Sequence, residues 1–504
     1  MNKNAWNTSN LLLEPNKIRG NVLIVSKENE VYMKVDAEPV IRQELTDFFS
    51  FTVPGAKFMP AYRNRVWDGK MRLYNAMTKE LYLGLLPYIE KFAEERDYEI
   101  EVHDNLNLAN NFSLKEANDF VTGLKTKFES RDYQLDSFTY CVRNNRALIV
   151  SPTASGKSFI IWLLSQWYQN ERMLIIVPTT SLVHQMRSDF IEYGTNPDDI
   201  HIIMSGQEKD VKAKITVSTW QSIYKMKKPF FSKFDVAIGD ECHLFKAKSL
   251  TSIMTKLVDC KYRFGFTGTL DGTNCHKLVL EGLFGQVKQF VKTKELIEKK
   301  HLANFKIKCC VLKYPEEEAK LMRGASYQDE IDFIVSHQRR NKFICNLTIS
   351  LSGNTLLLFQ YVEKHGKILY DDISQYDRAA GNERKVFFVS GQTSAEDREN
   401  VRAITEKEKN AIIIASYGTF STGINIRNLH NIIFSSPSKS RIRNLQSIGR
   451  GLRLGDSKTS ACLYDISDDL RYKKNNNYTL NHFAERIKTY NEEEFDYKIY
   501  NINL

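Results

Sequence analysis

The chain has 504 residues, of which 42% are hydrophobic and 26% are charged. At about 150 residues per domain, this length predicts roughly three domains, and the composition excludes a chain that is disordered throughout. Lysine and arginine number 71 against 61 aspartate and glutamate, so the formal net charge is +10. This excess favours a polyanionic partner such as nucleic acid, although solubility alone can also account for it.

Membrane segments and metal or disulfide frameworks are not expected. No apolar run approaches the roughly 18–20 residues that cross a bilayer, and the run Leu11–Leu13 is too short for a secretory signal. The eight cysteines include no CxxC pair and no Cys/His spacing suited to zinc. We therefore expect a reduced, cytoplasmic protein without a membrane partner.

The first part of the chain has the pattern of a small α/β module. Short apolar strands alternate there with segments whose apolar residues recur at helical spacing. We expect strands at 21–26, 31–35 and 98–102, and helices at 38–49 and 83–95. The asparagine-rich stretch 105–111 then predicts a linker, so an accessory domain is expected at 1–112.

From about residue 130 onward, short apolar strands bounded by polar or small residues alternate with helical segments. This pattern is typical of strands buried on both faces of a parallel sheet. The expected strands are 147–150, 174–177, 215–217 and 236–238, then 355–359, 386–389, 412–415, 432–434 and 462–464. Two tandem α/β domains are therefore expected at 113–298 and 299–475, followed by a C-terminal docking extension at 476–504.

A phosphate-binding loop is predicted at 151–158, where Ser-Pro-Thr-Ala-Ser-Gly-Lys-Ser follows a strand and precedes an apolar helix. Gly156, Lys157 and Ser158 match the end of the pattern GxxxxGK[ST], while Ser151 stands at the position of its first glycine. Such a loop holds phosphate oxygens with backbone N–H groups, reaches the β- and γ-phosphates with its lysine, and binds Mg²⁺ with its hydroxyl. An ordinary strand–turn–helix is the alternative.

Two adjacent carboxylates, Asp240 and Glu241, follow the strand at 236–238. An aspartate at the carboxyl end of such a strand can hold Mg²⁺, and the neighbouring glutamate can orient or deprotonate an attacking water. Seen alone, such a pair is more typical of a solvated turn. Together with a phosphate-binding loop on the same predicted sheet, it predicts nucleotide hydrolysis.

Further segments resemble the motifs of superfamily-two DExH helicases, in the order of that family. Asp240–His243 resembles the DExH box, Arg131–Gln134 the Q-motif, and Thr267–Thr269 motif III. The other matching segments are Pro178–Thr180, Thr219–Gln221, Ser421–Asn425 and Gln446–Arg453. Within the superfamily, the chain is similar to the UvsW helicases of T-even phages, notably at Phe48–Phe51 and Trp67–Arg72. One departure is Ala154, which stands where many helicases have glycine.

The resemblance implies two tandem RecA-like domains with ATP and Mg²⁺ in the cleft between them. The catalytic residues would be Lys157, Asp240 and Glu241 from the first domain and Arg450 and Arg453 from the second. The nucleotide would also contact Arg131, Gln134, Thr153, Gly156, Ser158 and Gly423, and Mg²⁺ would bind Ser158 and Asp240. ATP and nucleic-acid states would be coupled by His243, Thr267, Thr269, Thr422 and Gln446. A plain structural role for His243 and a basic helix face around the two arginines are the alternatives.

The resemblance also implies contacts to the sugar–phosphate backbone from strand-end loops of both domains, which position the motor without reading bases. The candidates are Thr179, Thr219, Gln221, Ser390, Gly391 and Thr419. Trp220 allows two interpretations, packing under the DExH strand or stacking on a base.

In the accessory module, basic residues are interleaved with aromatics, a composition that suits phosphate contact plus stacking on exposed bases. The candidates there are Arg63, Arg65, Trp67 and Lys70. The alternative is a twisted β-ribbon whose aromatics pack inward and whose charges are solvated.

The leading hypothesis is an ATP-dependent DNA helicase that remodels branched DNA in phage recombination, repair and replication, by fork regression, Holliday junction branch migration and R-loop unwinding. Its expected partners are branched or forked DNA and RNA–DNA hybrid. We expect a monomer in the cytoplasm of the infected cell. A duplex-DNA translocase resembling the motor subunit of restriction enzymes and an RNA helicase would use the same motor and remain alternatives. A non-catalytic DNA-binding protein and a small-molecule kinase are disfavoured, because the catalytic residues and the second-domain motifs are present together.

Overall fold

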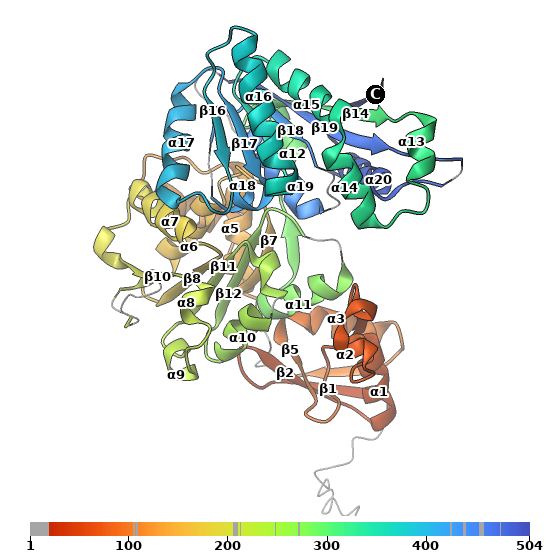
Figure 1. Cartoon of the computed structure of the whole chain (residues 1–504). Coiled ribbons are helices and arrows are strands. Elements are labelled where there is room, and N and C mark those ends of the chain that lie inside the picture. Colours follow the sequence, from red (N-terminus) through yellow and green to blue (C-terminus); the bar gives the residue numbers. More distant parts are fainter. Residues whose placement is uncertain are drawn as a thin grey trace, which may run out of the picture.

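The computed structural model describes residues 20–103, 106, 109–204, 210–211, 213–246, 248–270, 273–423, 426–436, 440–452, 458–473 and 475–504. Within these ranges, only the backbone is described for residues 246, 274, 275, 395, 421–423, 441–443, 446 and 450. The first α/β domain lies between the N-terminal module and the second α/β domain (Figure 1). None of the helices in the described part of the chain has the length and apolar character needed to cross a bilayer.

The N-terminal module is a small mixed sheet of order β5-β2-β1-β6, covered by two helices. Its elements are β1 (Val22–Lys27), β2 (Tyr32–Asp36), α1 (Pro39–Phe48), β5 (Glu80–Tyr82), α3 (Leu86–Glu94) and β6 (Glu99–Val102). Apolar residues alternate along β1 and β2, so one face of the sheet packs on the apolar stripes of the helices. A separate ribbon of β3 (Ser50–Thr52) and β4 (Lys70–Arg72) frames the short helix α2 (Pro60–Arg63).

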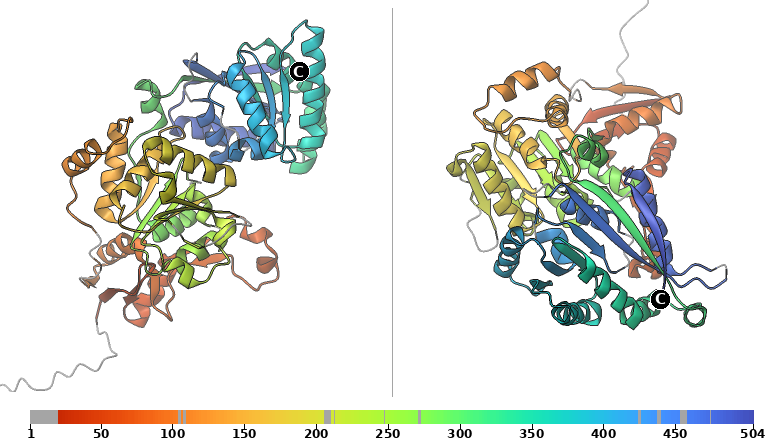
Figure 2. Two further views of the ribbon diagram at one scale, coloured as in Figure 1. Left: turned by 90° about the vertical axis from the view of Figure 1, so that its left-hand side faces the viewer. Right: turned by 90° about the horizontal axis from the view of Figure 1, so that it is seen from above.

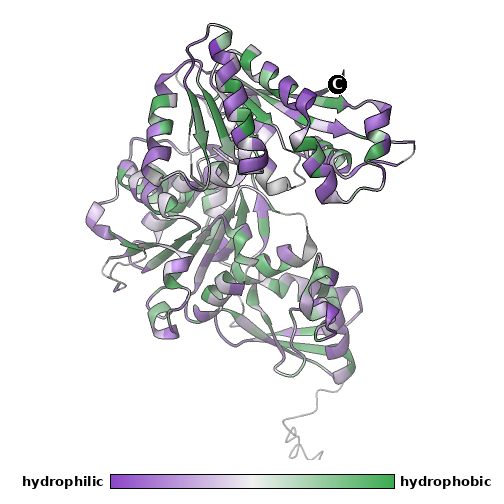
Figure 3. Cartoon of the chain, viewed as in Figure 1, coloured by the Kyte–Doolittle hydropathy of each residue, from purple (hydrophilic) through white to green (hydrophobic). Residues whose placement is uncertain are grey.

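The first α/β domain contains a sheet of seven described strands, all parallel, in the order β13-β7-β12-β11-β8-β10-β9. The strands are β7 (Arg146–Val150), β8 (Met173–Val177), β9 (Ile200–Ile203), β10 (Ile215–Thr219), β11 (Val236–Asp240), β12 (Tyr262–Thr267) and β13 (Val287–Gln289). The described helices are α4 (Leu114–Thr122), α5 (Asp132–Asn144), α6 (Lys157–Trp167), α7 (Thr180–Tyr193), α8 (Trp220–Ile223), α9 (Lys228–Phe231), α10 (Lys248–Lys256), α11 (Asn274–Phe284) and α12 (Thr293–Glu298). Figure 3 shows hydrophobic residues concentrated on the strands and hydrophilic residues on the outer helices.

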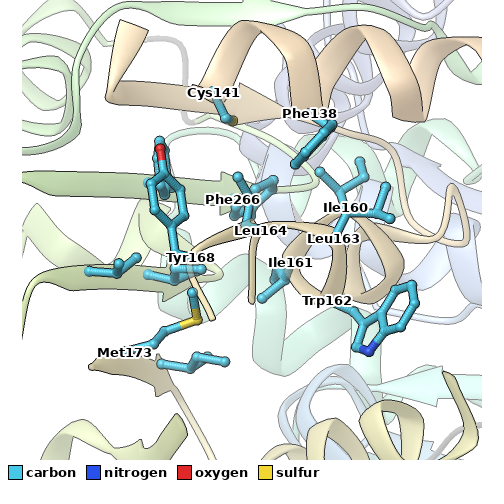
Figure 4. Close-up of a cluster of buried hydrophobic side chains, with 14 of the residues drawn as sticks. Phe138, Cys141, Ile160, Ile161, Trp162, Leu163, Leu164, Tyr168, Met173 and Phe266 are labelled. Carbon is cyan, nitrogen blue, oxygen red and sulfur yellow. The ribbon is translucent and has the colours of Figure 1, made fainter. Parts of the chain in front are cut away.

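Helix α6 is apolar on nearly all sides, and Phe159–Leu164 are all buried. Figure 4 shows its side chains packed between α5, represented by Phe138, and the sheet, represented by Phe266 and Met173. A helix that is hydrophobic around its whole circumference is stable only inside a core. Its N-terminus, where Lys157 and Ser158 lie, is therefore fixed on a rigid base.

The second α/β domain repeats this architecture, with seven described parallel strands in the order β16-β17-β15-β18-β19-β14-β20. The strands are β14 (Asn304–Lys313), β15 (Thr355–Phe359), β16 (Val386–Val389), β17 (Ile412–Ser416), β18 (Asn431–Phe434), β19 (Ser460–Asp469) and β20 (Tyr497–Asn503). The described helices are α13 (Glu316–Leu321), α14 (Tyr327–Ser336), α15 (Gln338–Ser350), α16 (Lys367–Ala379), α17 (Ala395–Lys407), α18 (Tyr417–Gly423), α19 (Arg441–Gly451) and α20 (Tyr478–Glu492). The side and top views show this domain lying directly against the first (Figure 2).

The N-terminal module is docked on the first α/β domain through close backbone packing. A Cβ atom added to Gly84 would lie 2.0 Å from the Glu281 carbonyl oxygen of α11, so the two backbones touch at this point. Tyr88 donates a hydrogen bond of 2.6 Å to the Glu281 carboxylate, and the buried Arg146 contacts Glu30 at 2.8 Å. These contacts pack the accessory module tightly against the first domain.

The expected fold class, two tandem RecA-like parallel-sheet domains with a small N-terminal α/β module, is confirmed. The sequence pattern missed several strands, among them β12, β14 and β20. Strand β12 contains Arg263, whose fully buried guanidinium donates to the carbonyls of Met254, Leu257 and Leu283 instead of reaching solvent. The tail predicted as a docking extension contains the expected helix, α20, but its strand β20 also pairs with β14, so this segment completes the second sheet.

Candidate active site

The phosphate-binding loop connects β7 to α6, and its backbone is held in an open curl. Ala154 has φ +67° and Gly156 has φ +84°, both in the left-handed region. A Cβ at residue 156 would lie 2.4 Å from the Gln134 amide nitrogen, so glycine is required there for space as well as for conformation. Ser151 is buried and its hydroxyl lies 2.5 Å from that of Ser155, a bond across the loop that a glycine could not make.

The Q-motif segment at the start of α5 supports this loop. Tyr133 donates from its hydroxyl to the Ser155 carbonyl at 2.7 Å, and the Gln134 amide donates to the same oxygen at 3.0 Å. The Gln134 side-chain oxygen accepts from the backbone N–H of Arg131 at 3.0 Å. Contact of Arg131 and Gln134 with the nucleotide base remains a prediction, and Tyr133 is a loop-holding residue that sequence reasoning missed.

The predicted catalytic carboxylates, Asp240 and Glu241, lie opposite the loop, at the carboxyl end of β11. Lys157 Nζ is 3.1 Å from Glu241 Oε1, and Glu241 has φ +49°, which turns its carboxylate back toward the loop. Burial raises the pKa of the Asp240 carboxyl to about 6, because loss of water disfavours its charged form. Burial acts on Glu241 in the same direction, but the Lys157 ammonium and the His243 ring outweigh it and lower its pKa. The site therefore contains the Lys157–Glu241 ion pair beside Asp240. A nearby cation would stabilise the charged form of the Asp240 carboxyl.

One ion-pair contact and two hydrogen bonds connect Glu241 to motif III. His243 Nδ1 lies 2.9 Å from the Thr267 hydroxyl and 3.4 Å from Glu241 Oε2. The Thr267 hydroxyl also donates to the Thr269 carbonyl at 2.9 Å. The residues His243, Thr267 and Thr269 are buried. The contacts join the end of β11 to the end of its neighbour β12, which is the position that a coupling element requires.

The donor set fits Mg²⁺ bound together with a nucleotide. The described residues contain no cluster of three or more His, Cys, Asp or Glu side chains that could hold a metal by themselves. Mg²⁺ does not need such a cluster, because it keeps several waters and binds one or two protein oxygens plus substrate phosphates. The Ser158 hydroxyl at the start of α6 and the buried Asp240 carboxylate are hard oxygen donors of this kind.

The second domain closes on this site through α19. A Cβ added to Gly449 would lie 2.4 Å from Thr153 Cβ, so the helix backbone packs directly on the phosphate-binding loop. A small cavity at this contact is lined by residues of both domains, including Pro152, Gly268, Ile448 and Leu452. Arg453 lies outside the described residues, and for Arg450, Gln446, Thr422 and Gly423 only the backbone is described.

The predicted nucleic-acid contacts lie at the carboxyl ends of adjacent strands. Thr179 follows β8 and Thr219 ends β10, while Ser390 follows β16 and Thr419 follows β17. Each of these four residues is hydrogen-bonded to a second hydroxyl-bearing residue. Sequence reasoning did not single out these partners. The hydrogen-bonded partners are Ser181 at 3.0 Å, Ser222 at 2.9 Å, Thr393 at 3.0 Å (to the Ser390 N–H) and Ser416 at 2.8 Å.

Two other predicted contacts, Gln221 and Gly391, and the ambiguous Trp220 have distinct surroundings. Gln221 is exposed, and its amide nitrogen lies 3.5 Å from the Pro178 carbonyl. Gly391 is exposed beside Ser390. Trp220 is partly buried and packs against a cluster that includes Phe245, which agrees with the packing interpretation.

The basic segment of the accessory module projects between β3 and β4. Arg63, Arg65 and Lys70 are exposed, and Phe58 and Val66 expose 66% and 81% of their surface. The Trp67 indole donates to the Lys70 carbonyl at 2.8 Å, which fixes the base of the projection. The β-ribbon of the alternative interpretation is present, but large apolar side chains at its tip face solvent instead of packing inward, and the predicted DNA contacts of this segment remain a prediction.

Three family models match successive parts of the chain. They are described as "DNA helicase UvsW, N-terminal" for residues 25–103, "Type III restriction enzyme, res subunit" for 90–272, and "Helicase conserved C-terminal domain" for 339–455. The chain is also 36% identical over 502 residues to the ATP-dependent DNA helicase UvsW of Enterobacteria phage T4, covering 94% of this chain and 98% of that protein. The chain belongs to the UvsW helicase family.

The solved structure of T4 UvsW covers 95% of this chain and 99% of its own, with 33% identity and a TM-score of 0.51. A more distant relative, the DNA 3'-5' translocase XPB2 of Sulfurisphaera tokodaii, is 29% identical over 259 residues, which cover 51% of this chain and 54% of that protein. The predicted membership of superfamily two is thus confirmed, and this chain, like other UvsW proteins, is a helicase with two RecA-like domains.

Proposed function

We propose that this chain is an ATP-dependent DNA helicase that remodels branched DNA by fork regression, Holliday junction branch migration and R-loop unwinding. The observation that carries the proposal is a cleft built from both domains. Lys157, Asp240 and Glu241 meet at one edge of the first sheet, and α19 of the second domain packs at Gly449 on the phosphate-binding loop that carries Lys157. A site assembled from both domains makes hydrolysis depend on how they are placed. Hydrolysis can therefore drive their relative motion.

Within this cleft, Lys157 contacts the β- and γ-phosphates, Ser158 and Asp240 hold Mg²⁺, and Glu241 orients the attacking water. Bound Mg²⁺ neutralises charge that develops on the phosphates. Arg450 and Arg453 contribute the arginine fingers, which are worth about 10³–10⁵ in rate in related enzymes. The helical backbone at Arg450, one residue after the loop contact at Gly449, supports its assignment.

The DNA strand runs along the hydroxyl-lined strand ends of both domains, and the accessory module contacts the branch point. Its exposed basic residues provide phosphate contacts, while Phe58, Tyr62 and Val66 offer exposed apolar surface for unpaired bases. Because the module is locked to the first domain at Gly84, the branch contact follows that domain during the ATP cycle. We infer a monomer acting in the cytoplasm of the infected cell on branched DNA and RNA–DNA hybrid.

The test of branch specificity is ATPase stimulation by a fork, a four-way junction, linear duplex, single strand and RNA at fixed salt. Branched DNA should stimulate most strongly. Substituting Arg63, Arg65 and Lys70 together by alanine should weaken junction binding and reduce the slope of log K against log salt by about 0.9 for each phosphate that is no longer neutralised. The matched control replaces three exposed basic residues of the second domain, Lys313, Lys320 and Arg323. Equal weakening by both sets would refute a specific role for the accessory module.

A duplex-DNA translocase is the second candidate function. It is favoured by the match of residues 90–272 to the family model named after the res subunit of type III restriction enzymes. Equal stimulation of the ATPase by linear duplex and by junctions would select this candidate. Preferential stimulation by RNA would instead select an RNA helicase using the same motor.

A further inference from the structure

A tyrosine outside the helicase motifs contacts the proposed magnesium ligand. The hydroxyl of Tyr193, the last residue of α7, lies 3.0 Å from the Ser158 hydroxyl at the start of α6. These residues are 35 positions apart in the sequence, and α7 is not part of the phosphate-binding loop. The contact therefore exists only because α6 and α7 pack against each other.

The tyrosine ring is held firmly in place. It packs edge-on against Phe128 and Phe159, with ring centroids 5.0 and 5.2 Å away, and lies 5.7 Å from Trp162. The Trp162 indole in turn donates to the Thr195 hydroxyl at 2.9 Å, which fixes the turn that follows α7. A phenol held in this way keeps its oxygen at a fixed place beside Ser158.

The chemistry of a metal-bound hydroxyl explains what such an oxygen can do. A serine that ligates a cation uses a lone pair of its oxygen, so its proton must point away from the metal, and coordination makes that proton a stronger donor. A tyrosine keeps its phenol proton at physiological pH, and its hydroxyl oxygen offers lone pairs that can accept such a proton.

We propose that Tyr193 is a positioning residue for the magnesium site: it accepts the hydroxyl proton of Ser158 and thereby turns the serine oxygen toward the metal. The inference rests on the proposed function, in which Ser158 is a magnesium ligand. Tyr193 itself touches neither the nucleotide nor the metal in this role. Its effect is confined to the affinity of the site for Mg²⁺ and to steps that need the metal.

The test is an equilibrium titration of the full-length chain with Mg²⁺ in the presence of a fluorescent, non-hydrolysable ATP analogue. Loss of one hydrogen bond should weaken the apparent Mg²⁺ affinity of Tyr193→Phe about threefold to tenfold, while analogue binding in EDTA stays unchanged. The matched control is Tyr168→Phe, which removes a buried phenol of the same domain whose hydroxyl has no hydrogen-bond partner among the described residues. This control should titrate like the unmodified chain.

A double-mutant cycle separates positioning from general packing. If Tyr193 acts through Ser158, the pair Ser158→Ala with Tyr193→Phe should show the same Mg²⁺ affinity as Ser158→Ala alone. Additive losses, or a Tyr193→Phe variant that binds Mg²⁺ as tightly as the unmodified chain or more tightly, would overturn the inference. If Ser158→Ala itself leaves the Mg²⁺ titration unchanged, the proposed metal role of Ser158 fails, and the inference falls with it for that separate reason.

Discussion

Replacement of Gly449 by alanine should uncouple ATP binding from ATP hydrolysis. The added methyl group would lie 2.4 Å from Thr153 Cβ, 2.8 Å from its Oγ1 and 3.1 Å from its Cγ2. Rotation of the threonine side chain can relieve the last two contacts, but its Cβ is fixed to the loop backbone. Because carbon atoms pack at about 3.5–4.0 Å, α19 must withdraw from the loop by about 1 Å or more.

That displacement falls on the geometry of the composite site. A misplacement of about 1 Å can cost about 10²-fold in rate. We therefore expect DNA-stimulated ATP turnover of Gly449→Ala to fall roughly 10–100-fold, while ATP binding to the loop of the first domain changes little. Retained binding of the ATP analogue would show that the variant is folded, so the lower turnover would report the displaced position of α19.

The assay compares steady-state ATPase with equilibrium binding of an ATP analogue at saturating DNA. Gly123→Ala is a suitable control, because its added Cβ would meet its nearest neighbours at 3.4 and 3.5 Å, which are ordinary contacts. Retention of full turnover by Gly449→Ala, with the control also unaffected, would refute the claim that hydrolysis needs α19 against the loop.

The other predictions concern Lys157 and Glu241, the module interface and pH. Lys157→Ala and Glu241→Gln should each abolish ATP turnover while DNA binding survives, and measurable turnover in either variant would contradict the site assignment. Gly84→Ala places a Cβ 2.0 Å from a backbone oxygen and should loosen the accessory module, seen as faster proteolysis between it and the first domain; an unchanged digestion pattern would contradict the proposed lock. Burial holds the pKa of His365 well below its ordinary value, so the folded chain favours the neutral ring. In the unfolded chain the ring takes up a proton as pH falls below about 6.5, and the free energy of unfolding therefore decreases there. Between pH 7.5 and 5.5 the stability of the unmodified chain should therefore fall relative to His365→Gln by about 1.4 kcal/mol, measured by denaturant unfolding, and an unchanged difference would contradict the assignment.

The parallel-sheet architecture and the meeting of Lys157 with Glu241 could be predicted from the sequence. Short apolar runs that are followed by functional residues indicate parallel strands, and the carboxyl ends of parallel strands lie at one edge of the sheet. At this edge Lys157 Nζ lies 3.1 Å from Glu241 Oε1. The positive φ angles of Ala154 and Glu241 could not be predicted, because neither residue favours that conformation. The surrounding contacts impose it.

Other features depend on tertiary packing that leaves no pattern in the sequence. Arg263 interrupts a strand with a charge, and only the structure shows the four backbone carbonyls, one of them that of Glu30, that make its burial possible. Tyr193 occupies one apolar position of a helix, and only the packing of α7 on α6 brings its hydroxyl to Ser158. The β20 strand carries mostly exposed residues, so no buried alternation indicated that it joins the sheet.

The central claim is that residues from both domains act on one ATP. The most direct measurement is the single-turnover rate of ATP hydrolysis by Arg450→Ala at saturating ATP and junction DNA, with nucleotide binding measured in parallel. If the second domain supplies an arginine finger, the rate should fall by about 10³-fold or more while binding is retained. A rate within a few-fold of that of the unmodified chain would contradict the claim.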